Sequence, residues 1–219
     1  MSARLPRSQT TVEGSAQLGG DARAADAPAR LLLLRHAPAA GAEARCVGQS
    51  EAVDPGLGPD GWEQATAAVR RLGGPIDLIV SSPARRALDT ARAWDLPIRV
   101  DQRLAERSFG EWEGRLWTEL WPTVPAAVLA DPEAYAAFTP PSGEPLDAVV
   151  ARVEAAMRDL SAEPGRRVLA VTHAGPVRLA VGAALGLPPG RALTLGADHA
   201  RAAVLDRHGE RWALERLNC

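Results

Sequence analysis

The chain has 219 residues, 46% of them apolar, which is enough for one domain with a sizeable core or for two small domains. Its formal net charge of −2 excludes the strongly basic surface that nucleic acids and anionic membranes attract. Every cation is an arginine, which excludes Schiff-base chemistry and the lysine-dependent phosphate loop.

Two cysteines are too few for a disulfide framework or a four-sulfur zinc site, so we expect a cytoplasmic protein. The apolar run 31–34 is far shorter than the roughly 20 residues of a membrane span. We expect a small-molecule ligand and neither nucleic-acid nor membrane partners; the oligomeric state stays open. The apolar residues of 1–30 follow neither a helical nor an alternating pattern, which predicts a flexible leader. A transit-type peptide is the alternative. A single domain is expected over 31–219.

From residue 31 onward, short apolar runs alternate with helical periods, a pattern typical of a mostly parallel α/β sheet. Branched apolar runs predict strands over 31–34, 76–80, 98–100 and 168–172. Apolar spacing predicts helices over 60–73 and 144–160. Ser82-Pro83 and Gly175-Pro176 look like helix starts, the second opening a helix over 176–185 that ends at Gly186.

The C-terminal part predicts an antiparallel edge, because strand-like segments 202–205 and 211–217 flank a plausible hairpin over 206–210. The segment 115–143 fits neither the helical nor the strand period and predicts an irregular helical cap over about 107–143. In this cap Trp117 and Trp121 belong either to a pocket or to the core. The expected fold is therefore a three-layer α/β/α domain with a mostly parallel central sheet.

Charged side chains follow four of the predicted parallel strands. Ligands bind open α/β sheets beyond the carboxyl ends of the strands, so these residues are expected to share one rim. Arginine forks and helix N-termini together suit a phosphate group. The residues are Arg35-His36, Arg85-Arg86, Glu106 and His173.

Four ordered motifs carry a family resemblance. The string Leu-Leu-Leu-Arg35-His36-Ala37 resembles the Arg-His-Gly signature of the histidine phosphatase superfamily, also called phosphoglycerate-mutase-like. Segments 82–87, 104–110 and 171–175 are similar to the family's second arginine, catalytic acid and second histidine motifs. The resemblance covers roughly residues 31–217.

The resemblance implies a phosphomonoester hydrolase that needs neither metal nor cofactor and forms a phosphohistidine on His36. Arg35, Arg86 and a protonated His173 would hold the phosphate, and the charge of Arg35 would lower the proton affinity of His36. Glu106 would donate and accept the proton, with Glu111 or Glu113 as rivals for that role.

Other positions are less specific. We expect Arg85 to be exposed, and Arg107 either contacts substrate or pairs with a carboxylate. Gly48 and Gln49 are weak substrate-binding candidates on the loop that follows the first motif. Alanines stand at 37 and 174, where the family has glycines. The backbone at these two positions must therefore adopt a conformation that a residue with a Cβ atom tolerates.

Two further histidines are not expected to bind substrate. Arg207-His208-Gly209 matches the signature better than Arg35-His36-Ala37, yet it lies in the predicted hairpin and should be solvated. His199 is expected to begin the penultimate strand.

Segments 109–114 and 140–144 are similar to the branch that includes α-ribazole phosphatases, so α-ribazole 5′-phosphate is one candidate substrate. The segment from 107 to 172 lacks the extra basic residues of the family's mutases, which favours water as the acceptor. A phosphoglycerate-mutase-type transfer and a catalytically silent phospholigand-binding protein are the alternatives.

Overall fold

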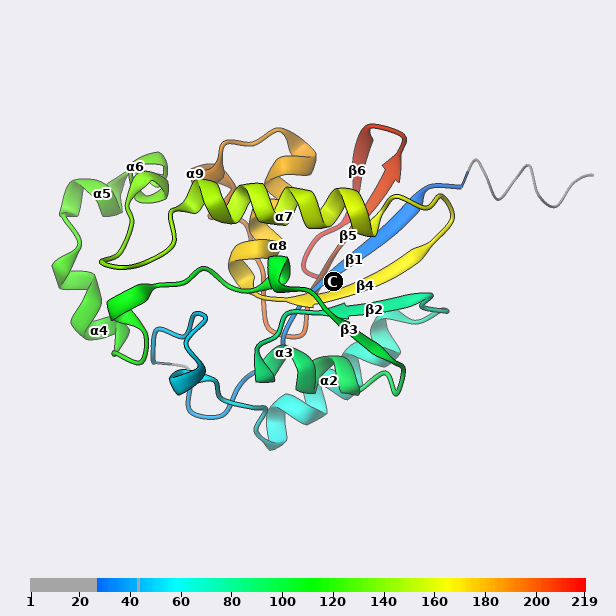
Figure 1. The fold of residues 1–219 in the computed structure, drawn as a ribbon, viewed down its shortest axis with the longest axis horizontal. Coiled ribbons are helices and arrows are strands. Elements are labelled where there is room, and N and C mark those ends of the chain that lie inside the picture. The colour runs from blue at the N-terminus through cyan, green and yellow to red at the C-terminus, as the bar shows by residue number, and fades with distance from the viewer. Residues whose placement is uncertain (1–26, 43) are drawn as a thin grey trace, which may run out of the picture.

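A six-stranded sheet in the order β3-β2-β4-β1-β5-β6 forms the centre of the computed structural model, which describes residues 27–42 and 44–219 (Figure 1). The parallel strands are β1 (Ala29–Arg35), β2 (Leu78–Ser81), β3 (Ile98–Val100) and β4 (Arg167–Thr172). β5 (Ala202–His208) runs antiparallel to β1, and β6 (Arg211–Arg216) antiparallel to β5. The predicted mostly parallel sheet with an antiparallel edge is confirmed.

Helices cover both faces of this sheet. On one face α2 (Pro59–Leu72) and α3 (Arg85–Arg92) pack against Leu32 and Leu34 of β1. On the other face α7 (Leu146–Leu160) and α8 (Ala174–Leu185) pack against Leu31 and Leu33. Successive side chains of a strand point to opposite faces, so a strand buried on both sides is apolar throughout.

The first strand starts earlier than predicted. Ala29 and Arg30 pair with Arg207 and Asp206 of β5, and the Arg30 guanidinium donates two hydrogen bonds of 2.7 and 2.6 Å to the Asp206 carboxylate. The predicted leader therefore overlaps β1 at residues 29–30, and its residues 1–26 lie outside the described part of the chain.

The two helix starts predicted from a proline differ from their predicted positions. α8 begins at Ala174 with His173 as its N-cap residue, two residues before the predicted start, and ends as predicted at Gly186, whose φ is +67°. α3 begins only at Arg85 after a cap at Ala84, so Ser82 does not cap it. The Ser82 hydroxyl contacts His173 instead, at 2.8 Å.

The predicted cap consists of short helices at one end of the sheet, on the left of Figure 1. They are packed around a small cluster made by Cys46, Trp112, Leu120 and Val124, and α9 (Pro189–Ala192) adjoins them through a bond from the Gly190 amide to Glu133. The cap elements are η3 (Gly110–Trp112), α4 (Trp117–Leu120), η4 (Trp121–Thr123), α5 (Ala126–Ala130) and α6 (Pro132–Ala137).

Two more short turns complete the order, η1 (Glu51–Val53) before α2 and η2 (Gln102–Leu104) after β3. In the described part of the chain, no helix combines the length and the apolar character that crossing a membrane requires.

Candidate active site

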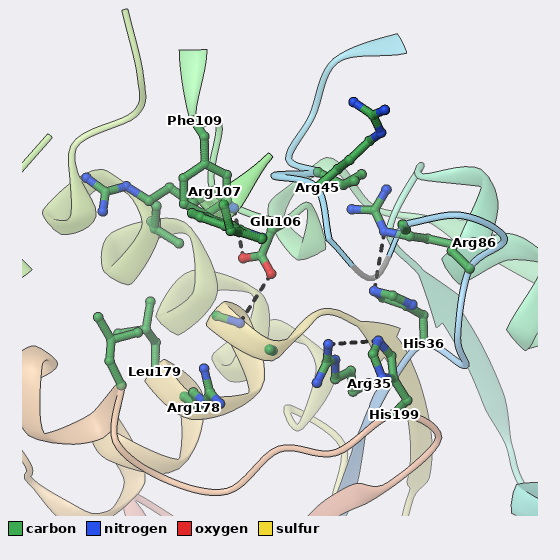
Figure 2. Close-up of a pocket in the computed structure, with 18 of the residues that line it drawn as sticks. Arg35, His36, Arg45, Arg86, Glu106, Arg107, Phe109, Arg178, Leu179 and His199 are labelled. Atoms are coloured by element: carbon green, nitrogen blue, oxygen red, sulfur yellow. Dashed lines mark hydrogen bonds between the residues drawn. The ribbon is translucent and has the colours of Figure 1, made fainter. Parts of the chain in front are cut away.

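A cavity of about 390 Å³ lies beyond the carboxyl ends of the parallel strands, between the sheet and the cap. His36 follows β1, Arg86 lies in the first turn of α3 after β2, and Glu106 follows η2; all three line the cavity (Figure 2). His173 follows β4 and lies behind this lining, fully buried.

The ring of His36 is held in one orientation. Its Nδ1 lies 2.8 Å from the carbonyl oxygen of Ala37, which can only accept, so Nδ1 carries the proton. The Nε2 atom is therefore unprotonated, and its lone pair accepts a hydrogen bond of 3.3 Å from Arg86 Nε. Burial, and next the charge of Arg86, hold the pKa of His36 well below its ordinary value. The charge of Arg35 also lowers the pKa of His36, as expected, but by less than burial or the charge of Arg86 does.

His173 lies 5.0 Å from His36, measured between ring centroids, with the two planes at 64°. Arg86 Nη2, always a donor, is 3.1 Å from Nδ1 of His173, so that nitrogen accepts and the proton is on Nε2, where it faces the Ser82 hydroxyl. Burial, followed by the charges of Arg86 and His36, sets the pKa of His173 well below its ordinary value. Burial and the protein's own charges thus favour a neutral His173, and the protonated form expected to hold phosphate stays a prediction. A phosphate dianion within hydrogen-bonding distance would act in the opposite direction.

Arg86 connects the two histidines. Besides both rings it contacts Gly48 O at 3.1 Å and forms an ion pair of 3.3 Å with Asp54, while remaining only 2% exposed. Burial lowers the pKa of its guanidinium against the attraction of Glu106 and Asp54, yet an arginine keeps its charge in a protein. Arg85 points out to solvent as predicted, with its side chain 71% exposed.

Arg35 reaches the cavity from the end of β1. Its Nη1 donates to Ala197 O and its Nη2 to His199 Nε2, both at 2.7 Å, while its buried Nε atom has no hydrogen-bond partner among the described residues. His199 does not begin a strand, since it occupies a turn three residues before β5. It lines the cavity with its ring centroid 5.3 Å from that of His36, so its predicted place is wrong.

Glu106 is the only carboxylate that lines the cavity among the described residues. The backbone N–H of Arg107 donates to its Oε1 at 3.0 Å, and that of Gly175 to its Oε2 at 3.3 Å (Figure 2). The rival Glu111 is exposed and accepts from the Ser142 hydroxyl.

The other rival, Glu113, has its carboxylate occupied by backbone N–H groups. Ser50 donates to it at 2.5 Å, Phe109 at 2.9 Å and Gln49 at 3.1 Å. Neither Glu111 nor Glu113 lines the cavity.

Gly48 and Gln49 lie behind the catalytic candidates rather than on the cavity wall. The Gly48 carbonyl binds Arg86, and the Gln49 side chain donates to the carbonyl of Glu106 at 2.6 Å. Arg107 donates to the carbonyls of Glu144 and Phe138 at 2.7 and 2.8 Å. Within the described ranges Arg107 forms no ion pair with a carboxylate. Of its two predicted roles, pairing with a carboxylate is therefore wrong, and contact with substrate stays a prediction.

The family model of the histidine phosphatase superfamily, branch 1, matches residues 31–219 of this sequence. The chain belongs to the histidine phosphatase superfamily. The match spans all four motifs, from Arg35-His36 through His173.

Three proteins illustrate what this chain is similar to. A bifunctional protein of Mycobacterium tuberculosis is 36% identical over 196 residues, covering 84% of this chain, but the chain spans only about half (51%) of that relative's length. The glucosyl-3-phosphoglycerate phosphatase of M. tuberculosis is 37% identical, over 73% of this chain and 76% of its own. A solved structure of a putative α-ribazole-5′-P phosphatase from Escherichia coli superposes with a TM-score of 0.75 at 26% identity, covering 87% of this chain and 96% of its own.

The departures from the histidine phosphatase pattern fit the backbone. Neither Ala37 nor Ala174 has a positive φ, so a Cβ atom costs no strain at either position. Gly175, in contrast, leaves no room for a side chain, because a Cβ atom there would lie 2.3 Å from Glu106 Oε1. His208 of the second Arg-His-Gly string is exposed at the end of β5, beside the hairpin turn.

The cap supplies an aromatic wall to the cavity. Trp117 and Trp121 stack with centroids 4.8 Å apart and planes 16° apart, and both line the cavity together with Phe109 and Tyr135. Trp117 also packs on the cap cluster, so it belongs to both pocket and core.

Sequence reasoning missed Ser82, Arg152, Arg178 and His199. Arg152 donates to Glu106 O at 3.0 Å and pairs with Glu144, while Arg178 lines the cavity from α8. Arg178 had a visible signal, because it lies four residues after Ala174 on the same helical face. No group of three or more histidine, cysteine or acidic residues within the described ranges is arranged to hold a metal.

Proposed function

We propose that this protein hydrolyses phosphomonoesters through a phosphohistidine formed on His36. The observation that carries the proposal is the orientation of that ring. The Ala37 carbonyl binds Nδ1–H, so Nε2 keeps its lone pair beside Arg86, at the wall of an arginine-lined cavity. The lowered pKa keeps the ring in this nucleophilic form at neutral pH.

In the first step, Nε2 of His36 attacks phosphorus and the P–O ester bond breaks. The electron pair goes to the leaving oxygen, which takes a proton from Glu106. In the second step, Glu106 takes a proton from water as its oxygen attacks phosphorus, and the P–N bond electrons return to Nε2. The products are the alcohol and inorganic phosphate, and both side chains return to their starting states.

Arg35 and Arg86 would hold the phosphoryl oxygens. The Nε atom of Arg35 has no partner in the part of the chain that the structure describes, and Arg86 is already within hydrogen-bonding distance of both histidines. Fixed positive charge in a buried site stabilises the charge that develops in phosphoryl transfer without reorganisation. We infer that His173 joins them when the phosphate dianion raises its pKa and Nδ1 takes up a proton.

The substrate would be a small phosphorylated metabolite. A cavity of about 390 Å³ has room for a leaving group, and its aromatic wall suits a ring. The relatives' names make α-ribazole 5′-phosphate and glucosyl-3-phosphoglycerate the first substrates to assay.

A phosphoglycerate-mutase-type transfer is the second candidate, and one observation favours it. Five arginines line the cavity, and two of them, Arg45 and Arg178, are neither proposed phosphate ligands nor part of the segment 107–172. The phosphatase names of the relatives favour water as the acceptor. Adding an alcohol acceptor separates the two, because a mutase forms a new ester and a hydrolase releases inorganic phosphate. A silent phospholigand-binding protein would have no use for Glu106 beside the arginines.

The test is hydrolysis of p-nitrophenyl phosphate by the full chain and by two matched variants. His36→Ala removes the nucleophile and should abolish turnover, together with the acid-labile phosphoprotein trapped by rapid quench. His208→Ala removes an exposed histidine that also follows an arginine in the sequence, and it should leave both unchanged. Unchanged hydrolysis by His36→Ala would refute the proposal.

A further inference from the structure

Arg178 has a guanidinium that the protein leaves largely unused. The cavity-lining residues of α8 are Ala174, Gly175, Arg178 and Leu179, which share one face of the helix. Arg178 Nε donates to Leu195 O at 2.8 Å. In the described part of the chain this is its only hydrogen bond, and no carboxylate forms an ion pair with it.

The other cavity arginines have partners or a role. Arg107 and Arg45 donate to backbone carbonyls, and Arg45 points away from His36 in Figure 2. Arg35 and Arg86 are the proposed phosphate ligands. A bound phosphate dianion would offset those two charges, which leaves Arg178 without a counter-ion in a cavity where the described residues contribute a single carboxylate.

The position of Arg178 along α8 indicates which part of a substrate it meets. The N–H of Gly175 binds Glu106, the proposed donor of a proton to the leaving oxygen. Arg178 follows three residues later, about 4.5 Å further along the helix axis at 1.5 Å per residue. It therefore lies further from His173 than Gly175 does, and a leaving group that extends from Glu106 along this wall of the cavity would meet it.

We propose that Arg178 binds a carboxylate on the leaving group, so that preferred substrates are phosphomonoesters with a carboxylate within a few bonds of the ester oxygen. This inference rests on the proposed hydrolase function. The Nη edge of a guanidinium matches a carboxylate in a bidentate pair, and this edge stays available because, among the residues the structure describes, only Nε of Arg178 is bound. A single guanidinium balances a carboxylate, whereas a second phosphate dianion would need more cations than this end of the cavity offers.

The test compares 3-phosphoglycerate with racemic glycerol 3-phosphate, which has a hydroxymethyl group in place of the carboxylate. For the full-length protein we expect kcat/KM to be at least about 10-fold higher with 3-phosphoglycerate. Arg178→Gln should remove about 10-fold to 100-fold of kcat/KM for 3-phosphoglycerate and change that for glycerol 3-phosphate less than about 3-fold. Arg178→Lys should restore part of the difference, since it keeps the charge without the fork.

Arg70→Gln is the matched control, because Arg70 is an exposed arginine of α2 outside the cavity. An equal loss on both substrates in Arg178→Gln would make Arg178 a phosphate ligand and overturn the proposal. A wild-type ratio near one would overturn it without any variant, even if Arg178→Gln failed to fold. Absence of turnover of every substrate, p-nitrophenyl phosphate included, would instead refute the hydrolase function. Calorimetric binding of the two esters would then decide the carboxylate site by the same ratio.

Discussion

A single methyl group at Gly175 would test whether Glu106 is the proton donor. A Cβ atom there would lie 2.3 Å from Oε1 and 3.3 Å from the carboxyl carbon of Glu106. Carbon and oxygen need well over 3 Å, so in Gly175→Ala the carboxylate must retreat by roughly 1 Å. The hydrogen bond from the Gly175 amide to Oε2, already 3.3 Å long, would lengthen further.

The size of the effect should depend on the leaving group. A positioned general acid contributes about 10²–10⁴-fold, and a misplaced one loses much of that. For an alkyl phosphate, whose alkoxide must be protonated as it leaves, we expect kcat to fall about 100-fold, or about 2.7 kcal/mol in barrier height. Nitrophenolate leaves with little need of a proton, so p-nitrophenyl phosphate should lose less than about 5-fold.

The assay is steady-state kcat on both substrates for the wild type, Gly175→Ala and the control Gly58→Ala. A Cβ atom at Gly58 would meet Ala40 Cβ at 3.6 Å, an ordinary contact, and Gly58 does not line the cavity. Gly175→Ala should also unfold at an unchanged or slightly higher urea concentration, since alanine favours helix over glycine. An equal loss on both esters, or none on the alkyl ester, would refute the assignment of Glu106.

Two further predictions concern the buried histidines. Ser82→Ala removes the oxygen that faces Nε2–H of His173 and should lower the free energy of unfolding by about 1–3 kcal/mol in urea titrations. Ser50→Ala is the control and should lower that free energy little, because the Ser50 hydroxyl makes no hydrogen bond within the described residues. The lowered pKa values of His36 and His173 mean that below pH about 6.5 the unfolded chain binds more protons than the native one. The free energy of unfolding should then fall as the pH falls, by up to about 2.7 kcal/mol per pH unit for two rings. Urea denaturation midpoints at pH 7.5 and 5.5 measure this dependence, and the control His208→Ala should show the same dependence as the wild type. A free energy of unfolding that does not change with pH would contradict neutral buried rings.

The parallel core was predictable because its signals are local. A strand buried on both faces is apolar at every position, so Leu31–Leu34 and Val168–Val171 are visible as uninterrupted runs. The rule that ligands bind beyond the carboxyl ends then placed His36, Arg86, Glu106 and His173 on one rim, and the structure brings them together there.

The contacts that hold these side chains were not predictable, because their partners are distant in sequence. Ser82 and Pro83 have the composition of a helix start, but the Ser82 hydroxyl lies against a histidine 91 residues away. The same holds for Gln49, which binds the carbonyl of Glu106 across 57 residues. A cap or a substrate contact is the simpler interpretation of such residues, since no local pattern contains the partner.

His199 differs from these cases, since its position follows from a strand direction that the sequence did predict. The parallel strands end at the cavity, and a strand antiparallel to them must begin there. In the structure Ala202, the first residue of β5, pairs with Leu34 at the end of β1. The residues just before Ala202 therefore lie beside Arg35 and His36, and a histidine three positions earlier reaches both. The rule for parallel sheets thus extends to a mixed sheet, where the loop that enters an antiparallel strand belongs to the same rim as the loops that leave the parallel ones.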